Sequence, residues 1–422
     1  MANDKLKFPK HFFWGAATSA HQVEGGNHNQ WSVWELENAR ALASAAPHKI
    51  GYLDGWDDIK AQATAPSNYV SGRATDHFNR YEEDFDLLEE MSLNAFRFSI
   101  EWSRIEPKEG QFDSSAIQHY RDYLKSLKQR GIEPFVTLSH WTVPVWFDQK
   151  GGFERSGNIK YFVRFAEKIV DELGPDVSYI TTINEPDTVF VHGYITGQHP
   201  PQKNSWIVGL WVYINLLRAH KRIYKLIKGR SRRFKVGFTK SYANVQAADA
   251  SRLSRLSVSV DNFLRDNAVL SFVGKKIDFL GVNYYFSDLH KGVGLTDHSP
   301  DTPRNDLGWE MLPDDLEIVL RRLGAKRPKT PIIITESGVA DASDKYRKWW
   351  LAHSLKAIDN AIRAGVRVDG YLHWSLLDNF EWAYGFWPHF GLVEVDYQTM
   401  KRKLRPSAKW YGQVVKQMRG TK

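Results

Sequence analysis

The feature that most constrains the fold is a series of apolar, β-branched runs that alternate with helical patterns along the whole chain. Apolar runs of this kind are typical of strands buried in a parallel sheet, and the helical patterns between them supply the crossovers that such a sheet needs. We predict eight strands, over Phe12–Gln22, Ala95–Trp102, Pro134–His140, Tyr179–Pro186, Lys235–Ser241, Asp278–Tyr285, Pro331–Glu336 and Tyr371–Leu377.

Helices are predicted between these strands from apolar periodicity and from boundary residues such as a capping Asp, an early Pro and a terminal Gly. They begin after Asp76, cover Ile117–Gln129, Phe162–Leu173 and Trp206–Lys228, begin again at Pro313, and cover Trp349–Ala364. Eight strands with interleaved helices in one unbroken chain predict an α/β fold, a single (β/α)8 TIM barrel that forms one domain over residues 1–422.

Three long connections follow predicted strands, at residues 23–75, 286–330 and 378–400. In a (β/α)8 barrel the loops after the strands build the face on which the active site lies. Loops of this length in a compact domain are usually functional. We therefore expect these long βα loops to form the active-site face.

Two glutamates stand at the ends of predicted strands. Glu185 follows the run Tyr179–Ile183, and Glu336 follows Ile332–Thr335. Carboxylates at the carboxyl ends of barrel strands point into the open face, and a retaining glycosidase requires two, one acid/base and one nucleophile. Taken alone, each glutamate is equally compatible with a strand-end ion pair, and Glu185 also with an acid at a helix N-terminus.

The composition is compatible with a carbohydrate cleft. Aromatic residues make up 14% of the 422 residues, with 16 Trp, 18 Tyr and 23 Phe. Tryptophan and tyrosine faces stack on the C–H faces of sugar rings, although a large core would also use many aromatic side chains. The chain has no cysteine, which excludes disulfides, cysteine–zinc sites and thiol catalysis.

Other classes of function are disfavoured. The net charge of +8 is spread over a long chain, and the basic clusters at 221–235 and 401–405 carry no nucleic-acid-binding motif, so we interpret them as solvated surface. The N-terminus has no apolar signal segment, and no run approaches the ~18 apolar residues of a membrane span. We expect a cytoplasmic protein with no nucleic-acid or membrane partner.

Several motifs occur together in an order that identifies a family. They run from Phe13–Ser19, through Thr182–Pro186 and Ile334–Gly338, to Trp374–Trp382 and Phe390–Asp396. In this order and spacing the chain resembles glycoside hydrolase family 1, the family of β-glucosidases and β-galactosidases, nearly end to end. The resemblance implies a retaining β-glycosidase that needs no metal or organic cofactor.

The resemblance implies roles for the two glutamates and for the residues that support them. Glu185 would be the general acid/base and Glu336 the nucleophile, with the carboxyl groups ~5–5.5 Å apart. Arg97 would pair with Glu336 and lower its pKa, and Tyr285 would donate its hydroxyl to the same carboxylate. Without the family, Arg97 would be one member of an ion pair with any acid, and Tyr285 an ordinary barrel aromatic.

Further residues would hold the sugar by the same resemblance. Asn184 would bind the 2-hydroxyl, Gln22 the 3- and 4-hydroxyls, and Glu381 the 4- and 6-hydroxyls, while Trp374 would lie under the ring. The remaining implied contacts are His140, Trp141, Asn283, Trp382 and Phe390, with Trp309 on the aglycone side. Because Glu381 is an acid and would repel phosphate, we expect a non-phosphorylated substrate.

The chain departs from the family pattern at four of these places. It has His21 where Tyr is more usual, Thr142 where the pattern has Asp after His-Trp, Ser337 where Asn follows the nucleophile, and His389 where Arg precedes the Phe. The first, third and fourth of these put the local shape of the cleft in question, but not the two glutamates.

We therefore predict double-displacement hydrolysis of terminal β-D-glucosides, as small glucosides or oligosaccharides, and also of β-galactosides or β-fucosides. Three alternatives stay open: a related enzyme with another sugar preference, such as a β-mannosidase, a transglycosidase of the same fold, and a non-catalytic carbohydrate-binding barrel. The sequence predicts neither the aglycone nor the oligomeric state.

Overall fold

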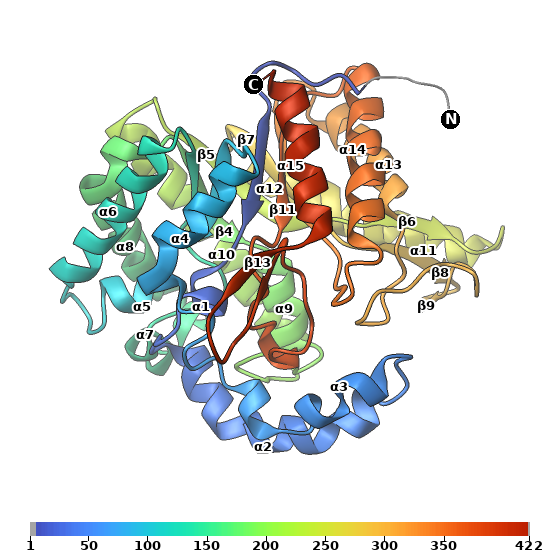
Figure 1. The fold of residues 1–422 in the computed structure, drawn as a ribbon, viewed down its shortest axis with the longest axis horizontal. Helices are drawn as coiled ribbons and strands as arrows, with labels where there is room; N and C mark the ends of the chain where they lie inside the picture. Colours follow the sequence, from blue (N-terminus) through green and yellow to red (C-terminus); the bar gives the residue numbers. More distant parts are fainter. Residues whose placement is uncertain (1–5, 421–422) are drawn as a thin grey trace.

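Eight parallel strands close into a barrel in the computed structural model, which describes residues 6–420 (Figure 1). The order around the barrel is β1-β11-β10-β7-β5-β4-β3-β2, so the first strand pairs with both the second and the last. The strands are β1 (Phe13–Ala17), β2 (Ala95–Ser99), β3 (Glu133–Thr137), β4 (Tyr179–Asn184), β5 (Lys235–Ser241), β7 (Phe279–Tyr284), β10 (Ile332–Ser337) and β11 (Val368–Trp374). The predicted α/β barrel is confirmed.

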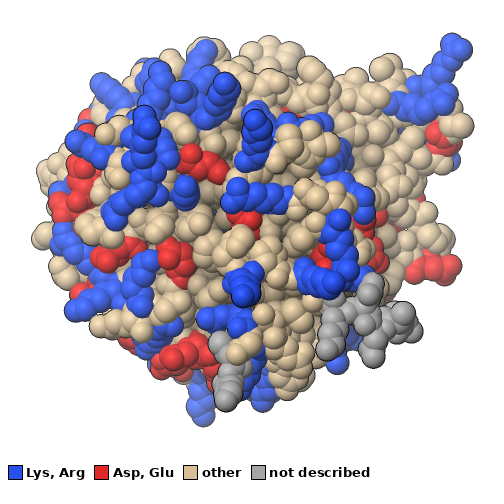
Figure 2. All heavy atoms as spheres, turned by 90° about the horizontal axis from the view of Figure 1, so that it is seen from above, with Lys and Arg blue, Asp and Glu red and all other residues tan. Residues whose placement is uncertain are grey.

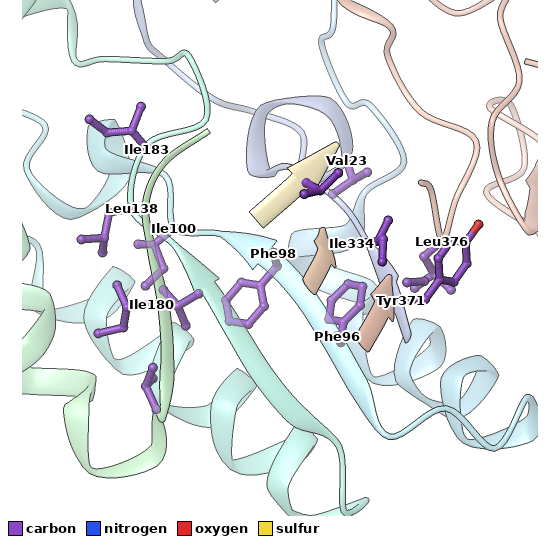
Figure 3. Close-up of a cluster of buried hydrophobic side chains, with 14 of the residues drawn as sticks. Val23, Phe96, Phe98, Ile100, Leu138, Ile180, Ile183, Ile334, Tyr371 and Leu376 are labelled. Carbon is purple, nitrogen blue, oxygen red and sulfur yellow. The ribbon is translucent and has the colours of Figure 1, made fainter. Parts of the chain in front are cut away.

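Alternation along β2 shows how the sequence builds two layers. Phe96 and Phe98 are buried between the barrel and its helices, where Phe98 packs on Tyr123 with the ring centroids 4.6 Å apart (Figure 3). Because successive strand side chains point to opposite faces, Arg97 between them points into the barrel. The interior otherwise holds apolar residues such as Phe135, whose ring stacks on Tyr179 at 4.4 Å.

Long helices surround the barrel and cover its outer face (Figure 1). They bury apolar faces such as Phe85 and Leu88 in the same cluster as the outward side chains of the strands. The principal helices are α4 (His77–Glu90), α6 (Ser114–Gln129), α8 (Ile159–Leu173), α10 (Trp206–Arg230), α13 (Leu316–Lys326), α14 (Arg347–Arg363) and α15 (Pro406–Arg419).

The first predicted strand is too long. It ends at Ala17, and the short helix α1 (Ala20–Val23) follows, so Gln22 lies on a helix and not at a strand end. The chain turns here because the amide N–H of Ala20 donates to the Ser99 hydroxyl at 2.8 Å, which ends the strand ladder.

Two helix boundaries also differ from prediction. The helix α10 runs through Gly229 to Arg230, because this glycine keeps a helical backbone instead of terminating the helix. Asp76 precedes α4 as predicted, but it makes no capping hydrogen bond, and its carboxylate instead accepts from Asn79 at 2.7 Å and from Arg73 at 2.9 Å.

The connection at 23–75 is mostly helical. It contains α2 (Gln30–Ile50) and α3 (Trp56–Ala63), which lie below the barrel in Figure 1, at the end opposite α15. Pro47 lies inside α2, and a proline in a helical pattern is ordinarily a sign of interruption. The helix begins at a reciprocal cap between Asn29 and Ser32 and is held by buried tryptophans. We call α2 and α3 the helical arm.

The other long connections add small sheets. The strands β8 (Ser287–Lys291) and β9 (Gly294–Thr296) join β6 (Asn244–Ala247) in a three-stranded sheet, next to α11 (Arg252–Asn262). Near the C-terminus, β12 (Val393–Val395) pairs with β13 (Arg402–Leu404). These additions lie beside the barrel and do not enter its strand ladder.

Lysine and arginine are spread over the face that carries the chain ends, with acidic residues between them (Figure 2). Several of the basic residues in the clusters noted in the sequence are paired. Arg230 binds Glu167 at 2.6 Å, and the buried Arg402 binds Asp84 at 2.9 Å. Within residues 6–420, no helix combines the length and the apolar character needed to span a bilayer.

Candidate active site

A cavity of about 370 Å³ lies at the carboxyl ends of the strands. Its floor comes from residues at or just after β3, β4, β5, β7, β10 and β11, and its outer wall from the inserted loops and from α9 (Pro186–Tyr194). The sequence-predicted residues that line it are His140, Trp141, Glu185, Tyr285, Trp309, Glu336, Trp374, Glu381, Trp382 and Phe390.

Glu336 is held from two sides at the end of β10. One carboxylate oxygen accepts from Arg97 Nη1, and the other accepts from the Tyr285 hydroxyl at 2.7 Å. Burial, followed by the negative charge of Glu336, keeps the pKa of Tyr285 well above its usual value, so the phenol stays a donor. The structure therefore brings together the three residues that the sequence placed around the nucleophile.

Arg97 is buried and fully engaged. In addition to Glu336, it donates to Asn184 Oδ1 at 2.7 Å and to Thr137 Oγ1 at 3.1 Å. A buried guanidinium is costly unless it is paired and hydrogen-bonded, and these contacts meet that requirement. Arg97 thus connects the Glu336 carboxylate to the residue next to Glu185.

Glu185 is the second carboxyl group on the cavity floor. Asn283 donates to one of its oxygens at 2.7 Å, and Thr188 donates to the other at 2.8 Å. Burial raises the pKa of Glu185 to about 8, and the negative charges of Glu336 and Asp187 add to this effect. At neutral pH Glu185 is therefore mainly protonated.

The backbone of Glu185 is also unusual, with φ of 39°. A non-glycine residue in this left-handed region costs free energy and persists where its surroundings hold it. Trp141 (φ 75°) and Trp382 (φ 51°) share this feature and line the same cavity. Three strained positions thus converge on one cavity.

Asn184 orients His140. The Asn184 Oδ1 atom accepts from Arg97, which leaves its amide nitrogen to donate to His140 Nε2 at 3.1 Å. Burial, and then the charge of Arg97, keep the pKa of His140 well below its usual value, so the ring is neutral and carries its proton on Nδ1. That Nδ1 has no hydrogen-bond partner among the described residues.

Some predicted sugar ligands lie behind the cavity lining. Gln22 donates to Asn379 Oδ1 at 2.8 Å and to the Phe380 carbonyl at 2.9 Å, so its amide supports the loop that carries Glu381. Asn184 and Asn283 are likewise buried, and their amides bind Arg97, Glu185 and His140. The sequence placed these residues correctly near the site, but their hydrogen bonds in this structure are internal.

Glu381 is a third buried carboxyl group in the cavity. Burial raises its pKa to about 8, with the charge of Glu336 as the second cause. Glu381 is thus mainly neutral at pH 7. The expected repulsion of phosphate by its charge therefore requires a pH above about 8.

Aromatic rings form the rest of the wall. Trp382 packs on Trp141 with the ring centroids 4.6 Å apart, and Trp374 stacks on His140 at 5.8 Å. On the opposite side, Phe390 lies 6.3 Å from Trp309 and 6.2 Å from Tyr285. Flat apolar walls with a few polar groups are typical of a site for a small organic ligand or a sugar ring.

The sequence analysis missed several lining residues. They follow Glu185 on α9 and in the loop after it, or lie in other loops: Thr188, His192, Gln198, His199, Ser241, Phe286 and Tyr384. The spacing of Thr188, three residues after Glu185 at a helix start, was a usable signal, because a side chain at that distance can reach back to the first residue. The others carry no local signal.

The helical arm reaches the cavity wall through His21, the first departure from the family pattern. His21 Nε2 lies 2.6 Å from Glu35 on α2, and its ring stacks on Trp382 with the centroids 5.4 Å apart. The Asn29 amide lies 3.1 Å from His21 Nδ1 while its oxygen caps α2. The proton of a neutral His21 is therefore on Nε2, directed at Glu35.

The other departures have local consequences. Ser337 accepts a hydrogen bond from the indole of Trp350 at 3.1 Å, behind the Glu336 strand end. His389 lies 2.9 Å from Asp378, which also binds Arg405 at 2.6 Å. Thr142 donates to Glu101 at 2.9 Å. Each of these side chains is used in packing beside the cavity.

An eight-stranded parallel barrel with paired buried carboxyl groups and an aromatic wall at the carboxyl ends of its strands defines a barrel enzyme of the glycoside-hydrolysing class. A sequence profile of glycosyl hydrolase family 1 matches residues 4–260 and 259–419. The chain belongs to glycosyl hydrolase family 1, which confirms the resemblance found in the sequence and the expectation of an enzyme.

Known proteins resemble the chain over nearly its full length. Beta-glucosidase A of Thermotoga maritima is 30% identical over 458 aligned positions, which cover 97% of this chain and 98% of that protein. The solved structure of beta-glucosidase from Thermotoga maritima in complex with glucoimidazole superposes with a TM-score of 0.85 at 29% identity, covering 97% of this chain and 99% of that chain. The beta-glycosidase from Pyrococcus horikoshii gives 0.85 at 34% identity, with coverage of 97% and 95%.

Proposed function

We propose that the protein hydrolyses terminal, non-phosphorylated β-D-glucosides with retention of configuration, through one domain over residues 1–422. The observation that carries this proposal is that two carboxyl groups in one cavity have opposite environments. Glu336 accepts from Arg97 and Tyr285, whereas burial raises the pKa of Glu185 to about 8. Pairs of titratable groups with different environments are the ones that divide acid and nucleophile roles.

In the first step, Glu336 attacks the anomeric carbon and forms an ester with the sugar. The bond to the leaving oxygen breaks, and that oxygen takes the proton of Glu185. Arg97 and Tyr285 hold the Glu336 carboxylate in position before the attack. The protonated state of Glu185 at neutral pH follows from its burial and from the negative charge of Glu336.

In the second step, water replaces the leaving group. Ester formation removes the charge of Glu336, so one cause of the raised pKa of Glu185 disappears and the residue becomes a better base. Glu185 takes a proton from water, the resulting oxygen attacks the anomeric carbon, and the ester bond to Glu336 breaks. The product keeps the β-configuration after two inversions.

The sugar would lie between the aromatic walls. Trp374 and Trp382 offer faces for the ring, the free Nδ1–H of His140 offers a donor, and Glu381 offers both a donor and an acceptor while it is protonated. Glucose as the preferred sugar is supported by relatives named beta-glucosidase, and activity on β-galactosides or β-fucosides and a cytoplasmic location stay predictions.

The test follows hydrolysis of p-nitrophenyl β-D-glucoside by NMR and by initial rates. We expect β-glucose as the first anomer released, and a rate that is lost in Glu336→Ala. Release of α-glucose first would overturn retention, and equal rates in the two proteins would overturn the assignment of Glu336. Absence of activity on every aryl β-glycoside would refute the proposed function.

A further inference from the structure

A second hollow of about 350 Å³ adjoins the catalytic cavity on its outer side. It is bounded by β8, by β9 and by the turn at 304–310 that follows them. Phe286 and Trp309 line both hollows, and their rings meet edge to face with the centroids 6.1 Å apart. A ligand too long for the catalytic cavity therefore has a continuous path across these two rings.

The turn that carries Trp309 is preorganised. The Asn305 side-chain oxygen accepts from the backbone N–H groups of Leu307 and Trp309, both at 3.0 Å. Arg304 donates to the carbonyl of Gly308 at 2.8 Å, and Gly308 has φ of 77°, which glycine adopts without steric cost. Trp309 is thus held in place before any ligand binds, which lowers the ordering cost of binding.

Charged groups border the far side of the hollow. The Arg304 guanidinium lies 2.9 Å from Asp297 and 3.4 Å from Glu310. The Arg304 side chain is 40% exposed and that of Asp297 is 74% exposed, so both remain accessible to a ligand. A guanidinium beside a carboxylate presents planar donors next to acceptors, a pattern that suits the adjacent hydroxyls of a sugar.

We infer that this second hollow binds the sugar units of a β-linked oligosaccharide beyond the glycosidic bond that is cleaved. The inference rests on the proposed function and specifies its substrate class. The unit next to the cleaved bond would stack near Trp309, and the following units would lie against Arg304 and Asp297. An alkyl aglycone fits this hollow less well, because it would desolvate these charged groups without hydrogen-bonding to them.

The test is the dependence of kcat/KM on chain length, measured with β-1,4-linked glucose oligomers of two to five units beside p-nitrophenyl β-D-glucoside. A disaccharide reaches only the Trp309 region, whereas a tetrasaccharide extends along the hollow. We expect kcat/KM to rise about tenfold from the disaccharide to the tetrasaccharide, the gain of a few hydrogen bonds and a stacked ring.

Two variants then locate the gain. Arg304→Ala and Asp297→Asn are expected to lower the tetrasaccharide-to-disaccharide ratio of kcat/KM about fivefold, whereas Arg321→Ala should leave the ratio unchanged. Arg321 is a matched control, since it is an exposed arginine on α13 that pairs with Glu317 at 2.7 Å. Asp297→Asn keeps the turn contacts of Arg304, so it tests the hollow even where Arg304→Ala destabilises the turn.

Three outcomes would overturn the inference. A wild-type kcat/KM that does not change with chain length would exclude binding of further sugar units. A ratio that none of the two groove variants changes would place those units elsewhere. A larger gain with octyl β-D-glucoside than with the tetrasaccharide would assign the hollow to an apolar aglycone. Activity on p-nitrophenyl β-D-glucoside tests the proposed function separately.

Discussion

The floor and the outer wall of the cavity are built in different ways. The floor consists of side chains at strand ends, such as Arg97, Glu336 and Asn184, and they are buried and bound to one another. The outer wall comes from inserted segments, among them the helical arm and the turn with Trp309, and it contains partly exposed residues. Interactions on the floor position reacting atoms, whereas interactions on the wall select what surrounds them.

This contrast predicts that changes on the floor affect rate and that changes on the wall affect binding. Floor residues form one hydrogen-bonded unit, so their effects should be large and not additive. Wall residues are connected to the floor through single contacts, such as the stacking of His21 on Trp382. The following experiments break or sharpen that distinction.

The largest effect is expected for Glu336→Ala. Removal of the nucleophile should lower kcat by at least about 10⁴-fold, because no other carboxylate is held by both Arg97 and Tyr285 at that place. Initial rates on p-nitrophenyl β-D-glucoside measure the loss. Glu317→Ala, on an outer helix, is the matched control, and a comparable loss there would mean that the assay reports stability instead of chemistry.

The next effect is expected for Glu185→Ala, which should lower kcat by about 10²–10⁴-fold, the range for general acid–base catalysis. In the wild type, kcat/KM should fall as the pH rises through about 8, because Glu185 then loses the proton that it must donate. The pH profile of Glu185→Ala should lack this alkaline limb.

Glu381 also titrates near that pH, since its pKa is about 8. Glu381→Gln is therefore the necessary control, and it should keep an alkaline limb. A limb that disappears in Glu381→Gln and stays in Glu185→Ala would assign the titration to the sugar-binding wall instead of the acid.

Stability should change in the opposite direction to activity. The pKa of Glu185 is about 8 in the folded protein and about 4.5 in an unfolded chain, so ionisation destabilises the fold increasingly as the pH rises between these values. A one-unit difference in pKa corresponds to about 1.4 kcal/mol. Glu185→Gln should therefore gain free energy of unfolding over the wild type, by about 3 kcal/mol more at pH 8 than at pH 5.

Urea unfolding at the two pH values measures this difference. Asp76→Asn is a suitable control, because the pKa of Asp76 is lowered by hydrogen bonds from Asn79 and Arg73 in spite of an opposing burial effect. Its substitution should cost stability above about pH 4 instead of adding to it. A constant gain for Glu185→Gln across the pH range would contradict the raised pKa.

The smallest effect is expected on the wall. His21→Ala removes the contact between Trp382 and the helical arm, and it should raise KM about tenfold with kcat and the pH profile almost unchanged. Glu35→Gln keeps an acceptor for His21 Nε2 and should remain near the wild type. A loss of kcat equal to that of a floor variant would contradict the division between floor and wall.

Local sequence was sufficient to predict the floor. Glu185 and Glu336 each follow an apolar run, and a run of that kind ends at the open face of a barrel whatever the loops do. Arg97 was legible for the same reason, because one charge between Phe96 and Phe98 on a buried strand must point to the other side.

The wall was less predictable. The helical arm contains Pro47, which argues locally against a long helix, and its stability comes from the packing of Trp31 and Trp34 on Trp382. Gln22 was expected to hold a sugar, but its amide binds Asn379 and Phe380, which are more than 350 positions away in the chain. Such contacts leave no local pattern.

The amino-acid sequence alone determined the barrel class, the family and the two carboxyl groups, because strand periodicity and strand-end position are local properties of the chain. Only the tertiary structure decided the protonation of Glu185 and Glu381, the orientation of His140, and the hollow beyond Trp309. Each of these depends on burial and on charges that come from other strands and loops, and both arise only when distant segments meet.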